Sequence, residues 1–312
     1  MKSNLYHNKF NTMGTRCQIL ISGVDTDYAA QVFNIIKKDV TRLEEDLSHF
    51  NEQSEVSQIN KWAASSPVPV SEAIFDLIKA CRKYYDLTRG LFDITQKPLV
   101  NFWSDKTEGY SANGEVEKLI SATGMNNVVL NETDHTVLFK HKKLKIDFSG
   151  IGKGYALERV KKLFRRFSVK NAFVSLGEST ILALGTHPEG DHWKISMKNY
   201  YEPDRNLHTF LVRDGALSTT SNFYSDSYGK LYARPVVDPK TGYPVRGLKS
   251  VSVCSGSAML VEVLSNAFLL SNDSYIKYVV ENVERIDAIK TEYESGKAVV
   301  RRFCTEVNKS LN

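Results

Sequence analysis

The sequence has little cysteine and no long hydrophobic run. Its four cysteines among 312 residues lie far apart and form no Cys-x-x-Cys pair, which favours a reduced compartment over a disulfide-forming one. No segment approaches the roughly 18 apolar residues that a membrane-spanning helix needs, and the N-terminal stretch has no apolar core of signal-peptide length. We therefore expect a cytoplasmic protein with no transmembrane segment; an exported, membrane-anchored form that has lost its leader is the alternative.

Several catalytic signatures are missing as well. The glycine-rich stretch SGIGKGY (149–155) is not a Walker loop, because Lys153 is followed by Gly154 where Ser or Thr is required. It is not a dinucleotide fingerprint either, because Tyr155 stands where the third glycine belongs. No G-x-S-x-G elbow occurs, and no histidine has the spacing of a zinc site. The sequence therefore gives no support to classical nucleophilic hydrolysis or zinc chemistry.

The charge balance is only mildly basic. Lys and Arg number 41 and Asp and Glu number 36, so the formal net charge is +5. This excess is compatible with an anionic small ligand but does not predict nucleic-acid binding. The length suits one large domain or two closely joined lobes.

The apolar periodicity predicts an α+β fold. Strands are expected in adjacent groups, which favours mixed or antiparallel sheets flanked by helices over a doubly wound parallel sheet. The first predicted helix ends near 47–60, a polar stretch with few core residues. Segment 214–226 is interpreted as a polar, hydroxyl-rich loop, and the apolar segment 90–103 is interrupted by Pro98. Helices are predicted at 25–47, 71–89, 153–167, 258–270 and 275–282. Strands are predicted at 15–22, 127–130, 136–140, 144–148, 171–176, 179–184, 193–197, 250–254, 285–290 and 298–304.

The stretch LKIDFSGIGKGYALERV (144–160) combines an alternating strand pattern, a glycine-rich turn and an amphipathic helix pattern. Such a strand–turn–helix unit presents backbone N–H groups to phosphate. A plain turn that uses its glycines only for positive φ is an equally good interpretation. The segment alone does not decide between them.

Four carboxylates lie at or near the ends of apolar segments: Asp93, Asp147, Asp238 and Glu262. Turn and cap chemistry explains such positions by default, most clearly for Asp238 in DPKTG. Glu262 differs because it interrupts an apolar helix pattern, and Asn266 follows one turn later on the same face. Two oxygen donors so placed can share a hard cation such as Mg²⁺; a buried hydrogen-bonded pair or an interface is the alternative.

Taken in order, eight stretches resemble the ApbE family, the FAD:protein FMN transferases. Any one of them is moderately specific, whereas the ordered set spans nearly the whole chain. The resemblance implies that 1–312 is a single two-lobed ApbE-like domain with an FAD cleft between the lobes. The stretches are TMGT (12–15), LSHFNEQSEVSQIN (47–60), GLFDITQKPLVNFW (90–103), IDFSGIGKGYALERV (146–160), SLGESTILALG (175–185), ALSTTSNFY (216–224), VVDPKTGYPV (236–245) and SAMLVEVLSNAFLL (257–270).

The resemblance also implies an activity. Members of the family use FAD and Mg²⁺, release AMP and leave FMN in phosphoester linkage on a Thr or Ser of a target flavoprotein. Two alternatives stay open: an FAD-binding protein that has lost transfer, and an FAD pyrophosphatase that yields free FMN. Neither the motifs nor the resemblance identifies a catalytic residue.

Site residues are carried over only where this sequence matches the family's motifs. Those implied to contact FAD are Met13, Phe50, Leu91, Phe92, Asp93, Asp147, Lys153 and Val237. Those implied to hold the metal are Gly150, through its carbonyl, and Glu262, Ser265 and Asn266.

Five positions depart from the family's pattern. Glu262 and Asn266 stand where the family has a metal-binding Asp and a Thr, and both still offer oxygen. Pro235 replaces a histidine, Glu178 replaces the second glycine of a pair, and Asn222 replaces another glycine. These departures favour FAD binding over efficient transfer.

Overall fold

An eight-stranded antiparallel sheet is the central feature of the computed structural model, which describes residues 5–104, 106, 112, 114–202, 204–226 and 230–305. The chain divides into two units, each assembled from segments distant in sequence. Unit 1, which contains the sheet, comprises Met1–Glu44, Ile151–Ala233 and Gly247–Asn312, and unit 2 comprises Glu45–Gly150 and Arg234–Arg246.

In unit 1, every neighbouring pair of strands in the large sheet runs antiparallel, which confirms the predicted fold class. The first and the last strand of the described chain form the two opposite edges of this sheet. In spatial order the strands are β1 (Tyr6–Thr12), β2 (Thr15–Ser22), β6 (Asn171–Leu176), β7 (Thr180–Leu184), β10 (Gly215–Ser221), β13 (Leu248–Ser255), β14 (Asp287–Glu294) and β15 (Lys297–Cys304).

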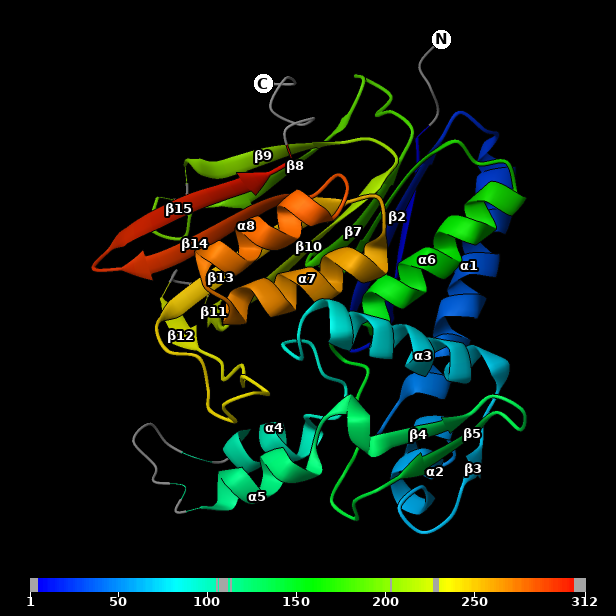
Figure 1. Ribbon diagram of the computed structural model, residues 1–312. Helices are drawn as coiled ribbons and strands as arrows, with labels where there is room; N and C mark the ends of the chain where they lie inside the picture. The colour runs from blue at the N-terminus through cyan, green and yellow to red at the C-terminus, as the bar shows by residue number, and fades with distance from the viewer. Residues whose placement is uncertain are drawn as a thin grey trace. The chain divides into compact units, whose positions relative to one another are not determined.

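Helices α6 (Gly152–Arg166) and α7 (Ala258–Leu270) pack against each other, and α7 lies directly on β10 and β13 (Figure 1). Helix α7 is apolar on nearly all sides because it is enclosed between α6 and the sheet. It begins at Ser257, whose side chain accepts a hydrogen bond from the N–H of Leu260. Both helices lie where the periodicity predicted them.

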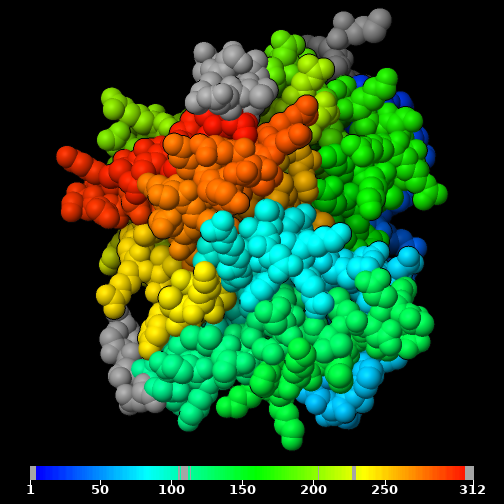
Figure 2. All heavy atoms as spheres, viewed as in Figure 1, coloured from blue at the N-terminus to red at the C-terminus, as the bar shows by residue number. Residues whose placement is uncertain are grey.

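The rest of unit 1 surrounds this sheet. The hairpin of β8 (Trp193–Lys198) and β9 (Asn206–Val212) shares a core with β7, β10 and β14, centred on Trp193 and Phe210. Helix α1 (Thr26–Leu47) packs its Phe33 against the ring of Phe10 on β1. Helix α8 (Asp273–Asn282), in orange, packs on β15 of the red β14–β15 hairpin (Figure 2). A small hairpin joins β11 (Phe223–Ser225) to β12 (Leu231–Ala233).

Unit 2 consists of short helices and one small sheet. Its second segment contributes Val237 to a buried cluster with Leu99, Trp103, Ala112 and Val116. The indole N–H of Trp103 donates to the carbonyl of Gly242, 2.7 Å away. The helices are α2 (Glu55–Trp62), α3 (Glu72–Leu87), α4 (Lys97–Ser104), α5 (Glu115–Ala122) and the 3-10 turn Met125–Asn127, and the sheet has the order β3 (Val68–Pro69), β5 (Thr136–Phe139), β4 (Val128–Asn131).

Three local predictions were wrong. Segment 214–226 is not a loop, because β10 and β11 lie within it. Pro98 does not interrupt an element but stands in the first turn of α4, where its missing N–H costs nothing. Segment 144–148 forms no regular strand, since only Lys145 makes an isolated bridge there.

Within the described part of the chain, none of the helices combines the length and apolarity that crossing a bilayer requires. All four cysteines are free, and two of them, Cys17 and Cys81, are buried. The cytoplasmic location stays a prediction of the sequence.

Candidate functional site

The glycine turn leads directly into α6 in unit 1. Gly152 and Gly154 are part of the helix, so positive φ does not explain them, and that interpretation of these two glycines was wrong. A Cβ at Gly154 would lie 2.5 Å from the carbonyl oxygen of Ala258. Gly154 therefore allows the backbones of α6 and α7 to approach closely.

This close approach brings Lys153 to Glu262. The Lys153 Nζ lies 2.8 Å from Glu262 Oε1, and the N–H of Gly154 donates to Oε2 of the same carboxylate. The Glu262 side chain is only 3% exposed, whereas that of Lys153 is 25% exposed. A buried carboxylate requires such compensation by a cation and an N–H donor.

Asn266 and Ser265 occupy the next turn of α7. The side-chain amide of Asn266 donates to the main-chain carbonyl of Glu262, 2.9 Å away, and its Oδ1 accepts from Thr220, 3.3 Å away. Glu262 and Asn266 are thus hydrogen-bonded to each other, through the main-chain carbonyl of Glu262. Ser265 is fully buried, with its hydroxyl within hydrogen-bond distance of Thr220, Ser218 and the Glu262 carbonyl.

The donor chemistry on this face of α7 suits a hard cation. Glu262, Asn266 and Ser265 all offer oxygen, as Mg²⁺ prefers. Among the described residues there is no group of three or more His, Cys, Asp or Glu side chains that could hold a metal. Glu262 is the one carboxylate among the side chains proposed to hold the metal, so the ion would need further oxygen ligands. Lys153 already engages Oε1 of that carboxylate, so a metal bound to it would lie close to the ammonium.

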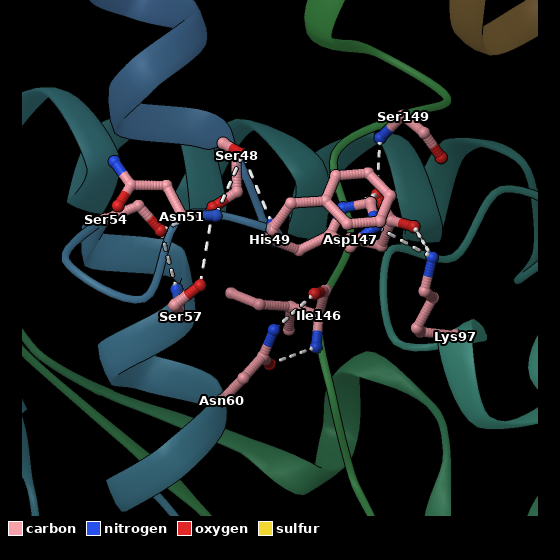
Figure 3. A network of polar contacts seen from close by, with 11 residues as sticks. Ser48, His49, Asn51, Ser54, Ser57, Asn60, Lys97, Ile146, Asp147 and Ser149 are labelled. Atoms are coloured by element: carbon pink, nitrogen blue, oxygen red, sulfur yellow. Dashed lines mark hydrogen bonds and ion pairs between the residues drawn. The ribbon is translucent and has the colours of Figure 1, made fainter.

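Unit 2 holds a second polar cluster, which Figure 3 shows around Asp147. The Asp147 carboxylate pairs with Lys97 Nζ at 2.9 Å and accepts from the N–H of Ser149 at 2.9 Å. His49 lies beside both, with Nε2 3.3 Å from Lys97 Nζ and Nδ1 3.8 Å from Asp147. Asn60 fixes the preceding residue by two hydrogen bonds with the backbone of Ile146.

Burial and neighbouring charges shift the pKa values of Asp147 and His49 in this cluster. Burial alone would raise the pKa of Asp147, but the hydrogen bonds from Lys97 and from the Ser149 N–H outweigh it and hold that pKa below its ordinary value. Burial lowers the pKa of His49; Asp147 opposes this effect and Lys97 adds to it. The cluster is therefore arranged around an ionised Asp147, a cationic Lys97 and a neutral His49.

Phe50 follows His49 and is 86% exposed. Its ring lies against the imidazole, with centroids 3.9 Å apart. The turn that presents it is held by Ser48, whose hydroxyl accepts from the N–H groups of Phe50 and Asn51. An exposed aromatic ring on a fixed turn is available for stacking with a planar ligand.

The segment 91–93, which the resemblance assigns to FAD contact, is largely buried. Phe92 and Asp93 are buried and Leu91 is half-buried. Asp93 accepts from the N–H and the hydroxyl of Thr95, and that hydroxyl accepts from the N–H of Gly124 at 2.6 Å. Burial raises the pKa of Asp93, and these hydrogen bonds oppose the rise. The Asp93 side chain therefore stabilises its own turn.

Two other predicted contacts have clear local roles. Met13 and Gly14 are the two loop residues between the paired Thr12 and Thr15, both with positive φ, as in a type I′ hairpin. Val237 is buried in the core of unit 2. Asp238 accepts from the N–H of Lys240, which confirms turn chemistry at this position.

Two of the departures from the family pattern, at Glu178 and Asn222, can be understood from the structure. Glu178 has a φ of 60°, the left-handed region that favours glycine, and pairs with Arg16 at 2.9 Å. Asn222 is buried and bonds both the Gly247 carbonyl and the Lys249 N–H. Pro235 is exposed.

The structure brings some predicted residues together and adds others. In unit 1, Lys153 forms an ion pair with Glu262, and Thr220 is hydrogen-bonded to Asn266 and Ser265. The sequence alone did not single out His49, Lys97 and Thr220. For His49 a usable signal existed, since it stands beside Phe50 in a motif that carries the resemblance. Residues assigned to FAD or the metal in unit 2 are Phe50, Leu91, Phe92, Asp93, Asp147, Gly150 and Val237, and in unit 1 Met13, Lys153, Glu262, Ser265 and Asn266.

Comparison with known sequences agrees with the ordered motifs. A family model described as the ApbE family matches residues 13–290. The FAD:protein FMN transferase of Escherichia coli K12 is 26% identical over 279 residues, which cover 86% of this chain and 79% of that relative. The protein of the same name from Klebsiella pneumoniae strain 342 is 29% identical over 254 residues, 79% of this chain and 76% of that relative.

Solved structures show the same fold. A flavin transferase ApbE from Vibrio cholerae superimposes with a TM-score of 0.82 at 21% identity, covering 96% of this chain and 97% of its own. An ApbE protein from Thermotoga maritima gives a TM-score of 0.80 at 27% identity and covers 98% of both chains. The resemblance stated from the motifs is thus confirmed.

Proposed function

Because the chain belongs to the ApbE family, we propose that it is an FAD:protein FMN transferase. It would transfer FMN from FAD to a Thr or Ser hydroxyl of a target flavoprotein. A bond forms between the hydroxyl oxygen and the FMN phosphorus, the phosphoanhydride bond to AMP breaks, and the hydroxyl proton is released. The observation that carries this proposal is the placement of Lys153, in the first turn of α6, against the buried Glu262 of α7.

Lys153 would bind the diphosphate of FAD. Its side chain is 25% exposed, and the first turn of α6 adds N–H groups and the positive end of the helix dipole. Positioning and charge neutralisation account for most of the catalysis of phosphoryl transfer, so a covalent enzyme intermediate is not required.

The remaining contacts to FAD are proposed from the motif matches. The exposed ring of Phe50 is suited to stack with the flavin, and Met13 stands on an ordered turn. Asp147 is held ionised and could accept hydrogen bonds from the dinucleotide. Three of these residues have buried side chains: Phe92, Asp93 and Val237. We therefore propose that they contact FAD only through their main-chain atoms, or that they hold the backbone in place. Leu91 is half-buried.

Mg²⁺ would be held by Glu262 and Asn266, with the Gly150 carbonyl and Ser265 as further candidates. When bound, the ion would neutralise charge on the diphosphate. Ser265 is the weakest candidate of the set because its hydroxyl is already engaged with neighbours on β10.

The test is a reaction followed by two readouts. A candidate acceptor flavoprotein, produced in cells without a flavin transferase, is incubated with FAD, MgCl₂ and this protein. Intact-mass spectrometry should show a gain of one FMN less water, and chromatography should show an equal amount of AMP. Removal of the acceptor hydroxyl by Thr→Val or Ser→Ala should abolish both.

Other outcomes identify the alternatives. AMP with an equal amount of free FMN and no labelled protein would indicate an FAD pyrophosphatase. FAD that binds and is recovered intact with every metal and acceptor would indicate a binding protein. Absence of both FAD binding and AMP release would overturn the proposal.

A further inference from the structure

Both carboxylate oxygens of Glu262 are engaged by α6. Oε1 pairs with the Lys153 ammonium at 2.8 Å, and Oε2 accepts from the N–H of Gly154. The side chain is 3% exposed, so water contributes little to its solvation. In the structure, the Glu262 carboxylate is therefore already neutralised by the Lys153 ammonium and hydrogen-bonded to the Gly154 N–H.

A divalent cation at this site would need the same carboxylate. The other proposed side-chain ligands on α7, Asn266 and Ser265, are neutral, and no acidic or His/Cys cluster of three occurs in the described residues. An ammonium and a divalent ion on one oxygen repel each other strongly at a separation of a few ångströms in a partly buried setting. The two cations cannot both use Glu262 at full strength.

We infer that Lys153 and the divalent cation compete for Glu262, and that a nucleotide diphosphate relieves this competition by drawing the Lys153 ammonium onto its own oxygens. The inference rests on the proposed function, which brings a diphosphate to Lys153. Glu262 then becomes free to bind the metal, and the diphosphate supplies the additional oxygen ligands that one carboxylate lacks.

The competition makes metal and nucleotide binding cooperative. Without a nucleotide, Lys153 keeps Glu262 occupied and the metal binds weakly. With a nucleotide bound, the ammonium has a second partner, and metal affinity rises. By linkage, the metal must raise nucleotide affinity by the same factor.

The decisive measurement is calorimetric titration of MnCl₂ into the full-length protein without nucleotide. Mn²⁺ serves as the probe because it favours the same oxygen ligands as Mg²⁺. Lys153→Met should bind Mn²⁺ about tenfold more tightly than wild type, within the roughly 5- to 150-fold typical of coupled sites. Lys161→Met is the matched control: it removes the same charge from the same helix, but Lys161 pairs with the Gly256 carbonyl.

The gain in Mn²⁺ affinity caused by Lys153→Met must also depend on Glu262. In the double variant Lys153→Met/Glu262→Gln it should disappear, as a double-mutant cycle requires. Added ADP, a diphosphate with no flavin to transfer, should raise Mn²⁺ affinity more in wild type than in Lys153→Met. The inference is overturned if Lys153→Met binds Mn²⁺ no more tightly than Lys161→Met, or if the gain survives in the double variant.

Lys153→Met leaves a buried carboxylate unpaired, so its folding is checked by circular dichroism. If it does not fold, Glu262→Asp tests the same point, because the shorter side chain withdraws the carboxylate from Lys153. Nucleotide-free Mn²⁺ affinity should then rise, and an unchanged affinity would overturn the inference. AMP release without the gain in Mn²⁺ affinity would contradict this inference alone. The gain without FAD turnover would contradict the proposed function alone.

Discussion

His49 lies with its Nε2 atom 3.3 Å from the Nζ atom of Lys97, so the imidazole accepts from an ammonium. Burial lowers the pKa of His49, Asp147 raises it and Lys97 lowers it. Lys97→Met should therefore raise the pKa of His49, and Asp147→Asn should lower it further. Ring resonances followed by NMR against pH, assigned with His49→Gln, would measure both shifts.

The same pKa has a consequence for stability. The folded chain binds a proton at His49 less tightly than the unfolded chain, whose histidine pKa is about 6.5. The free energy of unfolding should therefore fall as the pH decreases below about 6.5, and this part of the pH dependence should be absent in His49→Gln. Shifts of His49 in the same direction in Lys97→Met and Asp147→Asn would contradict the assignment.

The Thr95 hydroxyl should contribute to the stability of unit 2. It donates to Asp93 at 2.7 Å and accepts from the N–H of Gly124, and Thr95 is fully buried. Thr95→Val keeps the shape but removes one of the donors to the buried Asp93 carboxylate and the hydroxyl that accepts from the Gly124 N–H, so the free energy of unfolding should fall by roughly 1–3 kcal/mol. Urea denaturation would measure it. Thr95→Ser keeps the hydroxyl, so its free energy of unfolding should fall by less than that of Thr95→Val. A valine variant as stable as the serine variant would refute this role.

Gly154→Ala tests the close approach of α6 and α7. Helix propensity alone predicts a gain of about 1 kcal/mol for alanine, whereas a Cβ placed 2.5 Å from the Ala258 carbonyl oxygen predicts a loss of roughly 1–3 kcal/mol. We expect a loss in thermal or denaturant unfolding. Gly190→Ala is the control, because nothing lies within 4 Å of its added Cβ. If Gly154→Ala were more stable than wild type, α6 and α7 would have to move apart at little cost in free energy.

Phe50→Ala should separate binding from stability. The side chain is exposed, so the free energy of unfolding should change by no more than about 0.5 kcal/mol. FAD affinity, measured by flavin fluorescence titration, should fall by about 0.5–1.5 kcal/mol if the ring stacks on the ligand. Phe50→Trp should retain binding. Equal affinity in the alanine variant and wild type would remove Phe50 from the proposed site.

Glu178→Gly should not destabilise the protein. At a φ of 60° a non-glycine residue costs roughly 1–2 kcal/mol, and the exposed ion pair with Arg16 returns only about 0–1 kcal/mol. Differential scanning calorimetry should show an equal or higher unfolding temperature. Glu178→Ala removes the same charge but keeps the Cβ, so it should be less stable than Glu178→Gly. A Glu178→Gly variant less stable than wild type would show that the ion pair outweighs the backbone strain.

Much of the fold follows from local pattern. The apolar stripes of α1, α3 and α7 and the good N-cap at Ser71 predicted long helices that the structure confirms. Strand β10 was missed because Ser218 and Thr220, which read as polar, are satisfied by Ser265 across the helix–sheet interface. Hydroxyls paired in this way are buried at little cost, and no periodicity reveals their partner.

The site was predictable only in part. Glu262 stood out because a carboxylate interrupts an apolar helix, but its partner could not be identified, since α6 and α7 meet only through tertiary packing. His49, Lys97 and Asp147 come from three separate segments of unit 2, and only the folded chain brings them together.

The composition of unit 2 has a consequence for synthesis on the ribosome. Trp103 and its hydrogen-bond acceptor, the carbonyl of Gly242, are 139 residues apart, and Val237 fills the same cluster. A nascent chain that has emerged only as far as the glycine turn exposes an indole N–H and an apolar surface that its own later sequence will cover. Completion of the smaller unit is thereby delayed until most of the strands of the larger one have already been translated.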